Sequence, residues 1–443
     1  MTPIVPPPSS ETKEHRDARM KWWHDAHFGM FIHYGLYSGL AGEYEGKPLE
    51  QNCVEWYQTW VGLDDETYDS MAETLWKPAP NCTEQWAKLA KRAGCEYSVL
   101  TTKHHEGFCL FDSKYSDHTS PKLVGRDIVK EYMDSFRDQG LKPGLYHSLL
   151  DWHHPDYDNE LAVELAYPKG EKEKRKGKKM DHQKYIEYLH NQTHEILHNY
   201  GEVSELWFDF SSPVFDGEEA WGGVTLLEKI RKDNPNIIVN NRLFKREGSG
   251  NGDADNGTKF DYRYGDIITP EQFVPPSGIP GVNWESCMTL NDTWGYSKYD
   301  KNWKSNKKLI QTLSTIVSRG GNFLLNVGPK ADGSLTQQTL DAFEAIGAWM
   351  DVNSESIKKT RASPFDEAFE WGVVTTGAEE GVLYVHVFDS AEKGPIKLPV
   401  KGVKKAEILG SSAAVEIIKG ESNVELKPGA FPHPDVTVVK ITT

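Results

Sequence analysis

Cysteine is scarce in this sequence and widely spaced. The 443 residues include five Cys, at positions 53, 82, 95, 109 and 287, and no two of them form a Cys-x-x-Cys pair. Neither a disulfide scaffold nor a zinc knuckle is therefore indicated. The sequence also lacks an apolar run near the ~20 residues that a membrane-spanning helix needs. Its N-terminal stretch has no apolar signal-peptide core. We expect no membrane segment, and either a cytoplasmic protein or a mature periplasmic or secreted form whose signal peptide has been removed.

An excess of positive charge is missing as well. Lys and Arg number 50 against 66 Asp and Glu, which gives a formal net charge of −16. This balance argues against a protein that binds nucleic acid or acidic membranes. No Gly-x-Gly-x-x-Gly turn follows an early strand, so a dinucleotide-binding fold is not indicated. Aromatic side chains are what the chain has in abundance. Its 14 Trp can stack on sugar rings, although core packing is their commoner use.

Apolar strands and amphipathic helices alternate along the first 355 residues. Strands are predicted at 28–33, 97–102, 142–147, 206–210, 237–241, 266–268, 284–287 and 321–327. This pattern predicts an α/β fold, a (β/α)8-like TIM-type barrel over residues 1–355. After residue 356 the pattern changes to short β-rich runs separated by Gly and Pro turns, at 371–375, 382–388, 406–409, 415–418 and 436–442. These runs predict a C-terminal antiparallel β-sandwich over residues 356–443.

Polar side chains stand where the predicted barrel strands end. In chain order they are His33, His104 and His105, His147, Asp209, and Asn241 with Arg242. The reactive groups of a (β/α)8 barrel lie at the C-terminal ends of its strands, so we expect these side chains to meet at one face. A single buried His is usually a satisfied core residue, and Asp209 alone could equally cap a helix or form a salt bridge. The whole set together is better explained by a functional site.

Two kinds of chemistry fit this set. Clustered His and Asp can hold a catalytic metal. Alternatively, hydrogen-bonding groups among Trp rings can bind the hydroxyls of a sugar while a carboxylate attacks its anomeric carbon. The adjacency of His104 and His105 argues weakly against the metal, because neighbouring residues of a strand point to opposite faces. Aromatic residues close to these positions favour the sugar, namely Trp56, Trp152, Trp207 and Trp294.

Several longer stretches resemble family 29 of the glycoside hydrolases, the retaining α-L-fucosidases. They are FGMFIHYG (28–35), EWY (55–57), YSVLTTKHHEGFCLFDS (97–113), LYHSLLDW (145–152), ELWFDF (205–210), NNR (240–242) and NFLLNVGP (322–329). The similarity is spread over the strand ends between residues 15 and 355. It implies a barrel followed by a β-sandwich, and a double-displacement reaction through a covalent fucosyl-enzyme. It also implies that the reaction needs no metal and no organic cofactor.

The resemblance implies roles for individual residues. Asp209 would be the nucleophile, and His33, His104 and His105 would bind the hydroxyls of fucose. The other substrate-binding positions that it implies are Glu55, Trp56, Trp207, Arg242 and Trp294. His147 falls where family members often have Tyr. We retain it as a substrate-binding residue because an imidazole can also donate to a hydroxyl.

The general acid/base is expected in the region after the fifth strand, where two glutamates compete. Glu271, in ITPEQF, lies in a segment that resembles the one supplying the acid/base in several family members. Pro270 before it suggests an irregular loop that reaches over the site. Glu285, in NWESC, lies on a predicted strand, where a structural or substrate-binding role suits it equally well. We favour Glu271 and keep Glu285 as the second choice.

Together these observations predict a retaining exo-α-L-fucosidase that removes terminal fucose from oligosaccharides or glycoconjugates. Two alternatives stay open. One is a metal-dependent barrel hydrolase that uses His33, His104, His105 and Asp209, and the other is a non-catalytic fucose-binding protein. The sequence leaves the oligomeric state and the role of the sandwich open. Linkage preference should depend on the loops at 36–52, 155–180 and 243–285.

Overall fold

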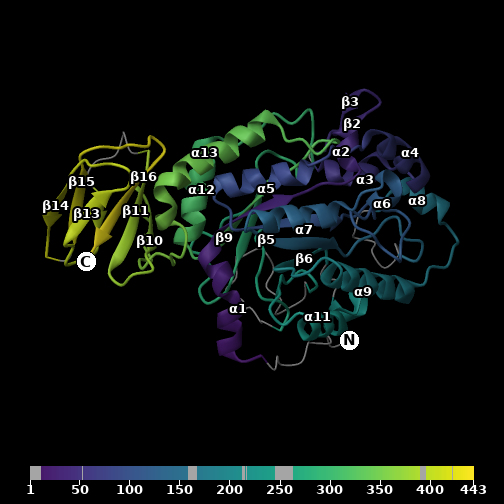
Figure 1. Ribbon diagram of the computed structural model, residues 1–443, viewed down its shortest axis with the longest axis horizontal. Coiled ribbons are helices and arrows are strands. Elements are labelled where there is room, and N and C mark those ends of the chain that lie inside the picture. The colour runs from purple at the N-terminus through teal and green to yellow at the C-terminus, as the bar shows by residue number, and fades with distance from the viewer. Residues whose placement is uncertain are drawn as a thin grey trace.

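The chain forms a parallel barrel with two antiparallel sheets beside it (Figure 1). The computed structural model describes residues 11–51, 53–157, 167–211, 215, 217–244, 263–389, 396–421 and 423–443. Among these residues, no helix combines the length and the apolarity needed to cross a bilayer. The described ranges include every strand end that the sequence marks as a site.

Seven parallel strands form the barrel sheet, in the order β7-β6-β5-β4-β1-β9-β8. Their bounds are Phe28–Ile32 (β1), Tyr97–Lys103 (β4), Lys142–Ser148 (β5), Glu205–Asp209 (β6), Ile238–Val239 (β7), Glu285–Thr289 (β8) and Asn322–Val327 (β9). The sheet closes through the segment between β7 and β8. There Ile267 pairs with Asn240 and Ile268 pairs with Trp284, both in parallel. The predicted barrel is confirmed, with its eighth strand reduced to these isolated pairings.

Helices cover the outside of the barrel strands (Figure 1). The longer ones are α1 (Lys13–Ala26), α4 (Asp65–Leu75), α5 (Cys82–Ala93), α7 (Ile128–Asp138), α9 (His182–His198), α11 (Gly223–Asp233), α12 (Asn306–Ser318) and α13 (Gln337–Asn353). Local sequence explains their ends. In α5, Trp86 and Ala90 face the core, and Gly94 ends the helix at a φ of 87°, which suits glycine. In α13, the Thr336 side chain accepts from the backbone N–H of Thr339.

Shorter elements lie in the connections between the barrel strands. They are α2 (Tyr37–Leu40), β2 (Glu43–Tyr44), β3 (Lys47–Pro48), the 3₁₀ turn Val54–Trp56, α3 (Tyr57–Val61), α6 (Ser120–Val124), α8 (Lys169–Lys174) and α10 (Gly217–Trp221). A second 3₁₀ turn, Ser354–Ser356, follows α13 and leads into the C-terminal sheets. Several of the connecting elements lie near the C-terminal ends of the strands. The turn Val54–Trp56, for example, places two cavity-lining residues, Glu55 and Trp56.

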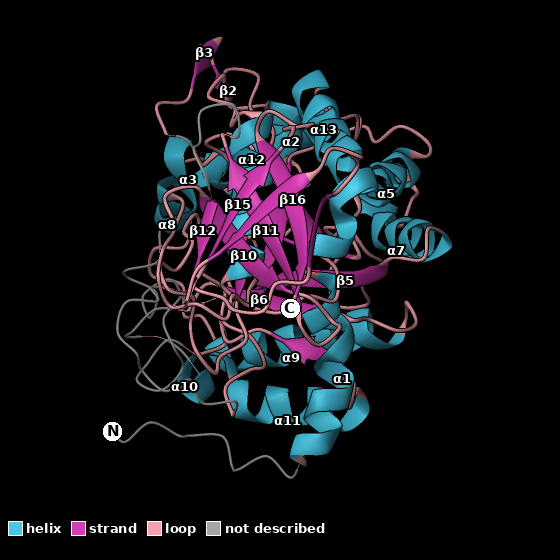
Figure 2. Cartoon of the chain, turned by 90° about the vertical axis from the view of Figure 1, so that its left-hand side faces the viewer, coloured by secondary structure: helices cyan, strands magenta, loops and turns pink. Residues whose placement is uncertain are grey.

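The C-terminal part of the chain forms two antiparallel sheets that face the viewer in Figure 2. One has the order β10-β11-β16-β13 and the other β12-β15-β14. Their bounds are Gly372–Thr376 (β10), Val382–Phe388 (β11), Ile396–Leu398 (β12), Lys405–Ile408 (β13), Val415–Lys419 (β14), Val424–Pro428 (β15) and Val436–Thr442 (β16). An apolar core that includes Val385, Leu398, Leu426 and Ile441 joins the two sheets. The predicted sandwich is confirmed, although the sequence reading missed β12 and β15.

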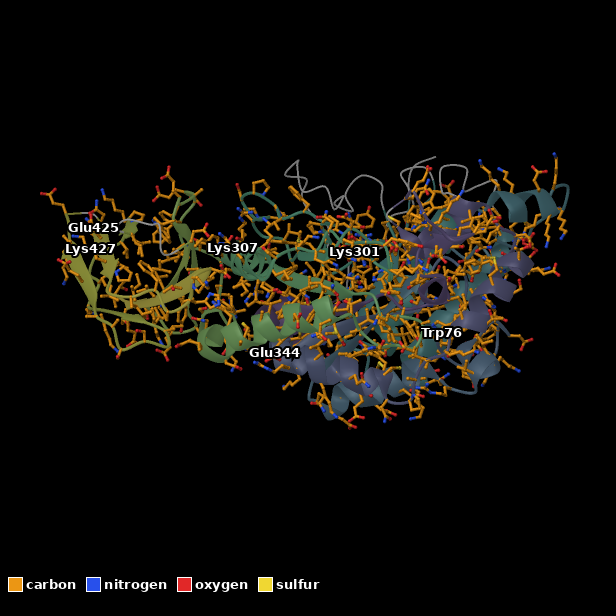
Figure 3. The ribbon with its side chains drawn as sticks, turned by 90° about the horizontal axis from the view of Figure 1, so that it is seen from above. Trp76, Lys301, Lys307, Glu344, Glu425 and Lys427 are labelled. Carbon is orange, nitrogen blue, oxygen red and sulfur yellow. The ribbon has the colours of Figure 1, made fainter. Side chains whose placement is uncertain are left out.

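The sandwich packs against the barrel helices through the outer face of its larger sheet. The Trp349 Nε1–H of α13 donates to the carbonyl of Val436 on β16 at 3.0 Å. The Tyr384 hydroxyl donates to Glu355 Oε2 at 2.8 Å. Seen from above, Glu425 and Lys427 of β15 lie at one end of the molecule, and Trp76 lies in the barrel at the other (Figure 3). The sheet β12-β15-β14 thus lies at the end of the molecule away from Trp76, and the boundary at residue 356 stays our proposal.

Candidate active site

A cavity of about 450 Å³ lies at the C-terminal ends of the barrel strands. This volume suits a small ligand. It is lined by Phe31, His33, Cys53, Glu55, Trp56, Trp60, His104, His105, Tyr146, Trp207, Asp209, Phe210, Ser211, Asn241, Arg242, Phe244, Thr269, Glu271, Cys287 and Trp294. The structure therefore brings together every residue that the sequence reading assigned to the site, except His147 and Glu285.

Asp209 is the last residue of β6 and carries a carboxylate that other polar groups hold in place. Its Oδ1 accepts from Arg242 Nη1 at 2.7 Å, and its Oδ2 accepts from the Tyr146 hydroxyl at 2.9 Å. Burial opposes its ionisation, but the charge of Arg242 and the hydrogen bonds from Arg242 and Tyr146 lower its pKa below the ordinary value. The carboxylate is therefore ionised at neutral pH. Phe210, directly after it, has a φ of 79°, a strained conformation of the kind found at functional sites.

Arg242 connects the two acidic residues of the cavity. Its Nη1 donates to Asp209, and its Nη2 donates to Glu271 Oε2 at 2.9 Å. The guanidinium is held from below by the Trp207 ring, whose centroid lies 4.4 Å away. On its edge it donates through Nε to Thr269 Oγ1 at 2.8 Å. Because the guanidinium is planar, permanently charged and held in place, its hydrogen bonds keep the carboxyl groups of Asp209 and Glu271 close to each other.

Three buried histidines form one wall of the cavity, and they are neutral. Burial lowers the pKa of His33 to about 3 and that of His105 to about 4, and it lowers the pKa of His104 as well. His33 Nδ1 lies 2.7 Å from Asn326 Oδ1. Because Asn326 Nδ2 donates to the Trp294 carbonyl at 2.7 Å, the amide oxygen faces the ring, and His33 carries its proton on Nδ1. Its Nε2 is therefore a hydrogen-bond acceptor.

Aromatic rings and one more acid complete the walls. The Trp294 ring lies 5.0 Å from His33, and the Trp56 ring lies 5.1 Å from His105 and 5.7 Å from the stacked Trp60 ring. Glu55 is buried, and its Oε2 accepts from the backbone N–H of Gly295 at 3.1 Å. Burial raises the pKa of Glu55 to about 7. The cavity thus joins apolar ring faces with polar groups that bind hydroxyls.

His147 lies outside the cavity, so the structure does not support its predicted role. On β5 it pairs with Phe208, and its Nδ1 hydrogen-bonds Thr102 Oγ1 at 2.9 Å in the layer between strands and helices. Side chains alternate along a strand, so the preceding residue, Tyr146, faces the barrel interior instead. Tyr146, whose hydroxyl donates to Asp209, is a cavity residue that the sequence reading missed. In the family resemblance, the Tyr that often replaces His147 stands in a Tyr-Tyr-Ser pattern; aligned with residues 146–148, this pattern would have offered Tyr146 as a candidate.

Glu285 also lies apart from the cavity. It is the first residue of β8 and is fully buried, so its carboxylate lies deep in the barrel rather than at the mouth. It accepts hydrogen bonds from the Tyr97 hydroxyl and from Trp207 Nε1, the latter at 3.3 Å. Burial raises its pKa to about 7. The geometry therefore favours Glu271 over Glu285 as the acid that reaches a ligand.

The strand-end histidines are not arranged as a metal site. His104 and His105 follow the last residue of β4, Lys103, so the alternation expected of a strand does not apply to them. Both rings line the cavity, with centroids 4.0 Å apart. Among the described residues, two groups of three His, Cys, Asp or Glu have their ligand atoms close enough to hold one ion, and neither includes a cavity residue. The geometry does not favour the metal-dependent alternative.

Comparison with known proteins gives one consistent result. The family model described as Alpha-L-fucosidase matches residues 6–355. An α-L-fucosidase of Dictyostelium discoideum is 30% identical over 451 residues, which cover 94% of this chain and 87% of that protein.

Two solved structures have the same fold over nearly the whole chain. α-L-Fucosidase isoenzyme 1 from Paenibacillus thiaminolyticus is 36% identical with a TM-score of 0.84, covering 97% of this chain and 99% of the other. A Bacteroides thetaiotaomicron α-L-fucosidase, 26% identical with a TM-score of 0.81, covers 100% of this chain and 98% of its own. That structure is a trapped covalent intermediate in complex with 2-fluoro-fucosyl fluoride.

Proposed function

Because the chain belongs to the α-L-fucosidase family, family 29 of the glycoside hydrolases, we propose that its cavity hydrolyses α-L-fucosides with Asp209 as nucleophile and Glu271 as acid/base. One observation carries the assignment: a single guanidinium, that of Arg242, bonds both carboxyl groups. Retention of configuration needs two carboxyl groups about 5–5.5 Å apart. Two acids held against one guanidinium fit that requirement.

The reaction divides into two displacements. First, the Asp209 carboxylate attacks the anomeric carbon, the bond to the leaving oxygen breaks, and Glu271 gives that oxygen its proton. Next, Glu271 takes a proton from water, the water oxygen attacks the same carbon, and the bond to Asp209 breaks. The Arg242 charge keeps Asp209 ionised before the first step and binds the free carboxylate again after the second.

The remaining cavity groups bind the sugar. A fucose ring carries hydroxyls that need donors and acceptors, and apolar C–H surfaces that pack on aromatic rings. The neutral imidazoles of His33, His104 and His105, with the Glu55 carboxyl, meet the first need. Trp56, Trp207 and Trp294 meet the second. Neutral histidines suit an uncharged substrate, because they bind its hydroxyls without leaving an unpaired charge buried in the cavity.

The shape of the cavity supports action on terminal fucose. Phe31, Trp207 and Cys287 lie on the inner side of the barrel and form the floor. A closed floor means that a sugar chain enters the cavity by one end, so the residue that reaches Asp209 is the terminal one. The group linked to this residue would be the rest of an oligosaccharide or glycoconjugate. Of the loops expected to set linkage preference, residues 158–166 and 245–262 lie outside the described part of the chain.

Trapping and product analysis test this function. We expect a 2-deoxy-2-fluoro-fucosyl fluoride to add one fluorofucosyl group per chain, on the peptide that contains Asp209, as measured by mass spectrometry. NMR of aryl α-L-fucoside hydrolysis should show the α-anomer of fucose first. Formation of the β-anomer first, or no turnover despite saturable fucose binding, would contradict the proposal. The second result would instead support the non-catalytic fucose-binding alternative.

Replacement of Tyr146 by Phe tests the part of the site that the sequence reading missed. The Tyr146 hydroxyl is one of the hydrogen bonds that, with the charge of Arg242, lower the pKa of Asp209 against the effect of burial. A hydrogen bond to a charged group contributes roughly 1.5–3 kcal/mol, so we expect kcat/KM to fall roughly 10- to 100-fold. Without this donor the pKa of Asp209 rises, so the acidic limb of the kcat/KM profile moves to higher pH. His147→Asn, one residue along β5 but outside the cavity, should leave that limb in place.

A further inference from the structure

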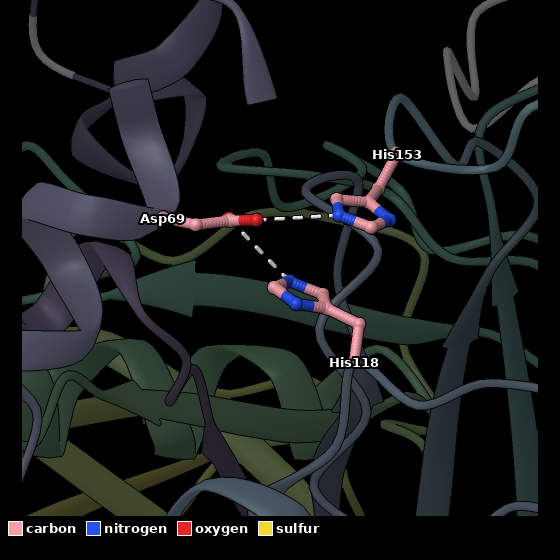
Figure 4. A group of neighbouring side chains, drawn as sticks. All are labelled: Asp69, His118 and His153. Atoms are coloured by element: carbon pink, nitrogen blue, oxygen red, sulfur yellow. Dashed lines mark hydrogen bonds and ion pairs between the residues drawn. The ribbon is translucent and has the colours of Figure 1, made fainter. Parts of the chain in front are cut away.

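Three side chains that can bind a metal meet outside the sugar cavity (Figure 4). They are Asp69 on α4, His118 in the loop before α6, and His153 in the loop after β5. The Nε2 atom of His153 lies 3.2 Å from Asp69 Oδ2, and that of His118 lies 3.7 Å from Asp69 Oδ1. One ligand atom from each residue lies within 4.8 Å of the others. None of the three lines the cavity, and the proposed reaction does not use them.

Two polar atoms of this cluster are buried without a hydrogen-bond partner. They are His118 Nε2, on a side chain that is 8% exposed, and Asp69 Oδ1. Both ring nitrogens of His118 face carboxylate oxygens beyond hydrogen-bond distance: Nε2 lies 3.7 Å from Asp69 Oδ1, and Nδ1 lies 4.0 Å from Glu73 Oε1. With its proton on Nδ1, His118 would direct the Nε2 lone pair at Asp69 Oδ1, and a cation between these two atoms would satisfy both.

We propose that Asp69, His118 and His153 bind a transition-metal dication of the zinc class, with water as the fourth ligand. Ligands about 2.0–2.1 Å from a tetrahedral Zn²⁺ are about 3.3–3.4 Å apart. The separations here are 3.2 Å from His153 Nε2 to Asp69 Oδ2 and 3.7 Å from His118 Nε2 to Asp69 Oδ1, so each imidazole faces a different oxygen of the carboxylate. Two imidazoles and one carboxylate are a ligand set for Zn²⁺ or its neighbours, whereas Mg²⁺ and Ca²⁺ prefer oxygen ligands throughout.

The surroundings hold these ligands in place. The rings of His118 and His153 stack in parallel, with centroids 4.1 Å apart and planes at 5°, so the more exposed His153 ring has to turn before both nitrogen lone pairs point at one ion. The backbone of His153 is fixed on both sides: its N–H donates to Asp151 Oδ1 at 3.2 Å, and its carbonyl accepts from Arg175 Nη2 at 3.1 Å. Glu73 follows Asp69 by one turn of α4, and its Oε1 lies 4.0 Å from His118 Nδ1, which adds a second carboxylate beside the cluster. The side chains of Asp69 and His153 are 20% and 33% exposed, which gives an ion access from solvent.

The site would stabilise the fold beside the cavity and take no part in the chemistry. The loop of His153 also binds the segment that carries His104 and His105. The Trp152 N–H donates to the His105 carbonyl at 2.8 Å, and Asp151 forms a buried ion pair with Lys103 at 2.9 Å. An ion that joins α4 to this loop and to the loop of His118 would therefore stabilise the positions of His104 and His105 from outside the cavity. This inference rests on the cluster's own geometry and stands or fails apart from the fucosidase assignment.

Metal titration of the whole protein tests the proposal. Protein stripped with a chelator and then titrated with Zn²⁺ in a calorimeter should bind one equivalent with a Kd of micromolar or below, and its Tm should rise. Co²⁺ in its place should give the intense visible absorption of a tetrahedral site. His153→Gln, which alters a partly exposed side chain, should weaken this binding at least ~100-fold. We expect the same loss in Asp69→Asn.

The second group of potential ligands, His194, His198 and Asp233, offers a matched control. Its members are all exposed, and His198 and Asp233 form an ion pair at 3.9 Å. His194→Ala should keep the high-affinity equivalent and its Co²⁺ spectrum. The proposal is overturned if stripped wild-type protein takes up neither ion stoichiometrically. It is equally overturned if the folded His153→Gln variant, checked by its metal-free thermal unfolding, binds as the wild type does.

Discussion

Replacement of Asp209 by Ala should lower kcat/KM on an aryl α-L-fucoside by ~10³-fold or more. Each factor of ten corresponds to about 1.4 kcal/mol of lost transition-state stabilisation. The loss is large because the carboxylate both forms the covalent bond and neutralises the developing positive charge on the sugar. The measurement is steady-state kinetics on protein whose thermal unfolding remains cooperative.

Azide separates a missing nucleophile from a misfolded site. In Asp209→Ala the small anion can occupy the place of the carboxylate beside Arg242 and attack the anomeric carbon from the same side. We therefore expect activity to return with azide and β-fucosyl azide to form, with inverted configuration. Asp266→Asn offers a comparison, because Asp266 pairs with Arg19 away from the cavity. Activity of Asp209→Ala within tenfold of the wild type would exclude Asp209 as the nucleophile.

Strand alternation explains which site residues could be predicted from sequence. Trp207 and Asp209 are two apart on β6 and share its inner face, and Trp207 pairs with Tyr146 on β5. His147 pairs with Phe208, which belongs to the outer core between strands and helices. The strand ends were therefore placed correctly, but a shift of one residue on β5 exchanged a cavity residue for a core residue. The register that decides this comes from pairing between strands and cannot be read from one strand alone.

The neighbouring histidines show the opposite case. Alternation predicts that His104 and His105 face opposite sides, yet both line the cavity because β4 ends at Lys103. The chain beyond that residue is no longer extended, and Gly107, at a φ of 80°, turns it back. A buried ion pair between Lys103 and Asp151 anchors this turn across 48 positions in sequence. Contacts over such distances decide the shape of the site and leave no local signal.

The structural evidence for Glu271 over Glu285 also comes from a contact between residues far apart in the sequence. Position along a strand already distinguishes them: Glu285 begins β8, and the ends of the strands carry the chemistry. What sequence alone could not supply is the hydrogen bond from Arg242 to Glu271, which joins the end of β7 to a loop 29 positions later. This bond places the Glu271 carboxyl in the cavity with Asp209.

Replacement of Glu271 by Ala should produce a loss that depends on the leaving group. For a fucosyl oligosaccharide, whose leaving alcohol needs a proton, we expect kcat/KM to fall ~10²- to 10⁴-fold. For a dinitrophenyl fucoside, which leaves without one, the first step should be nearly unchanged. The fucosyl-enzyme should then accumulate, seen as a burst of phenolate, because water lacks its base. Azide needs no base, so it should restore turnover and give α-fucosyl azide with retained configuration.

Two further variants make this result specific to the Glu271 proton. Glu271→Gln keeps an oxygen that can accept from Arg242 but has no acidic proton, so its kinetics should match those of Glu271→Ala. If Glu271 mainly orients Arg242, Glu271→Gln should instead retain most of the activity. Glu285→Gln, in the barrel interior, should show neither a burst nor azide rescue, although its loss of stability can exceed that of the Glu271 variants because its carboxyl is buried. A burst with azide rescue in Glu285→Gln, and not in Glu271→Ala, would reverse the assignment. Loss of a buried structural carboxyl lowers activity on every substrate alike, whereas loss of the proton donor lowers it only where the leaving group needs a proton. Leaving-group dependence therefore separates proton transfer from support of the barrel.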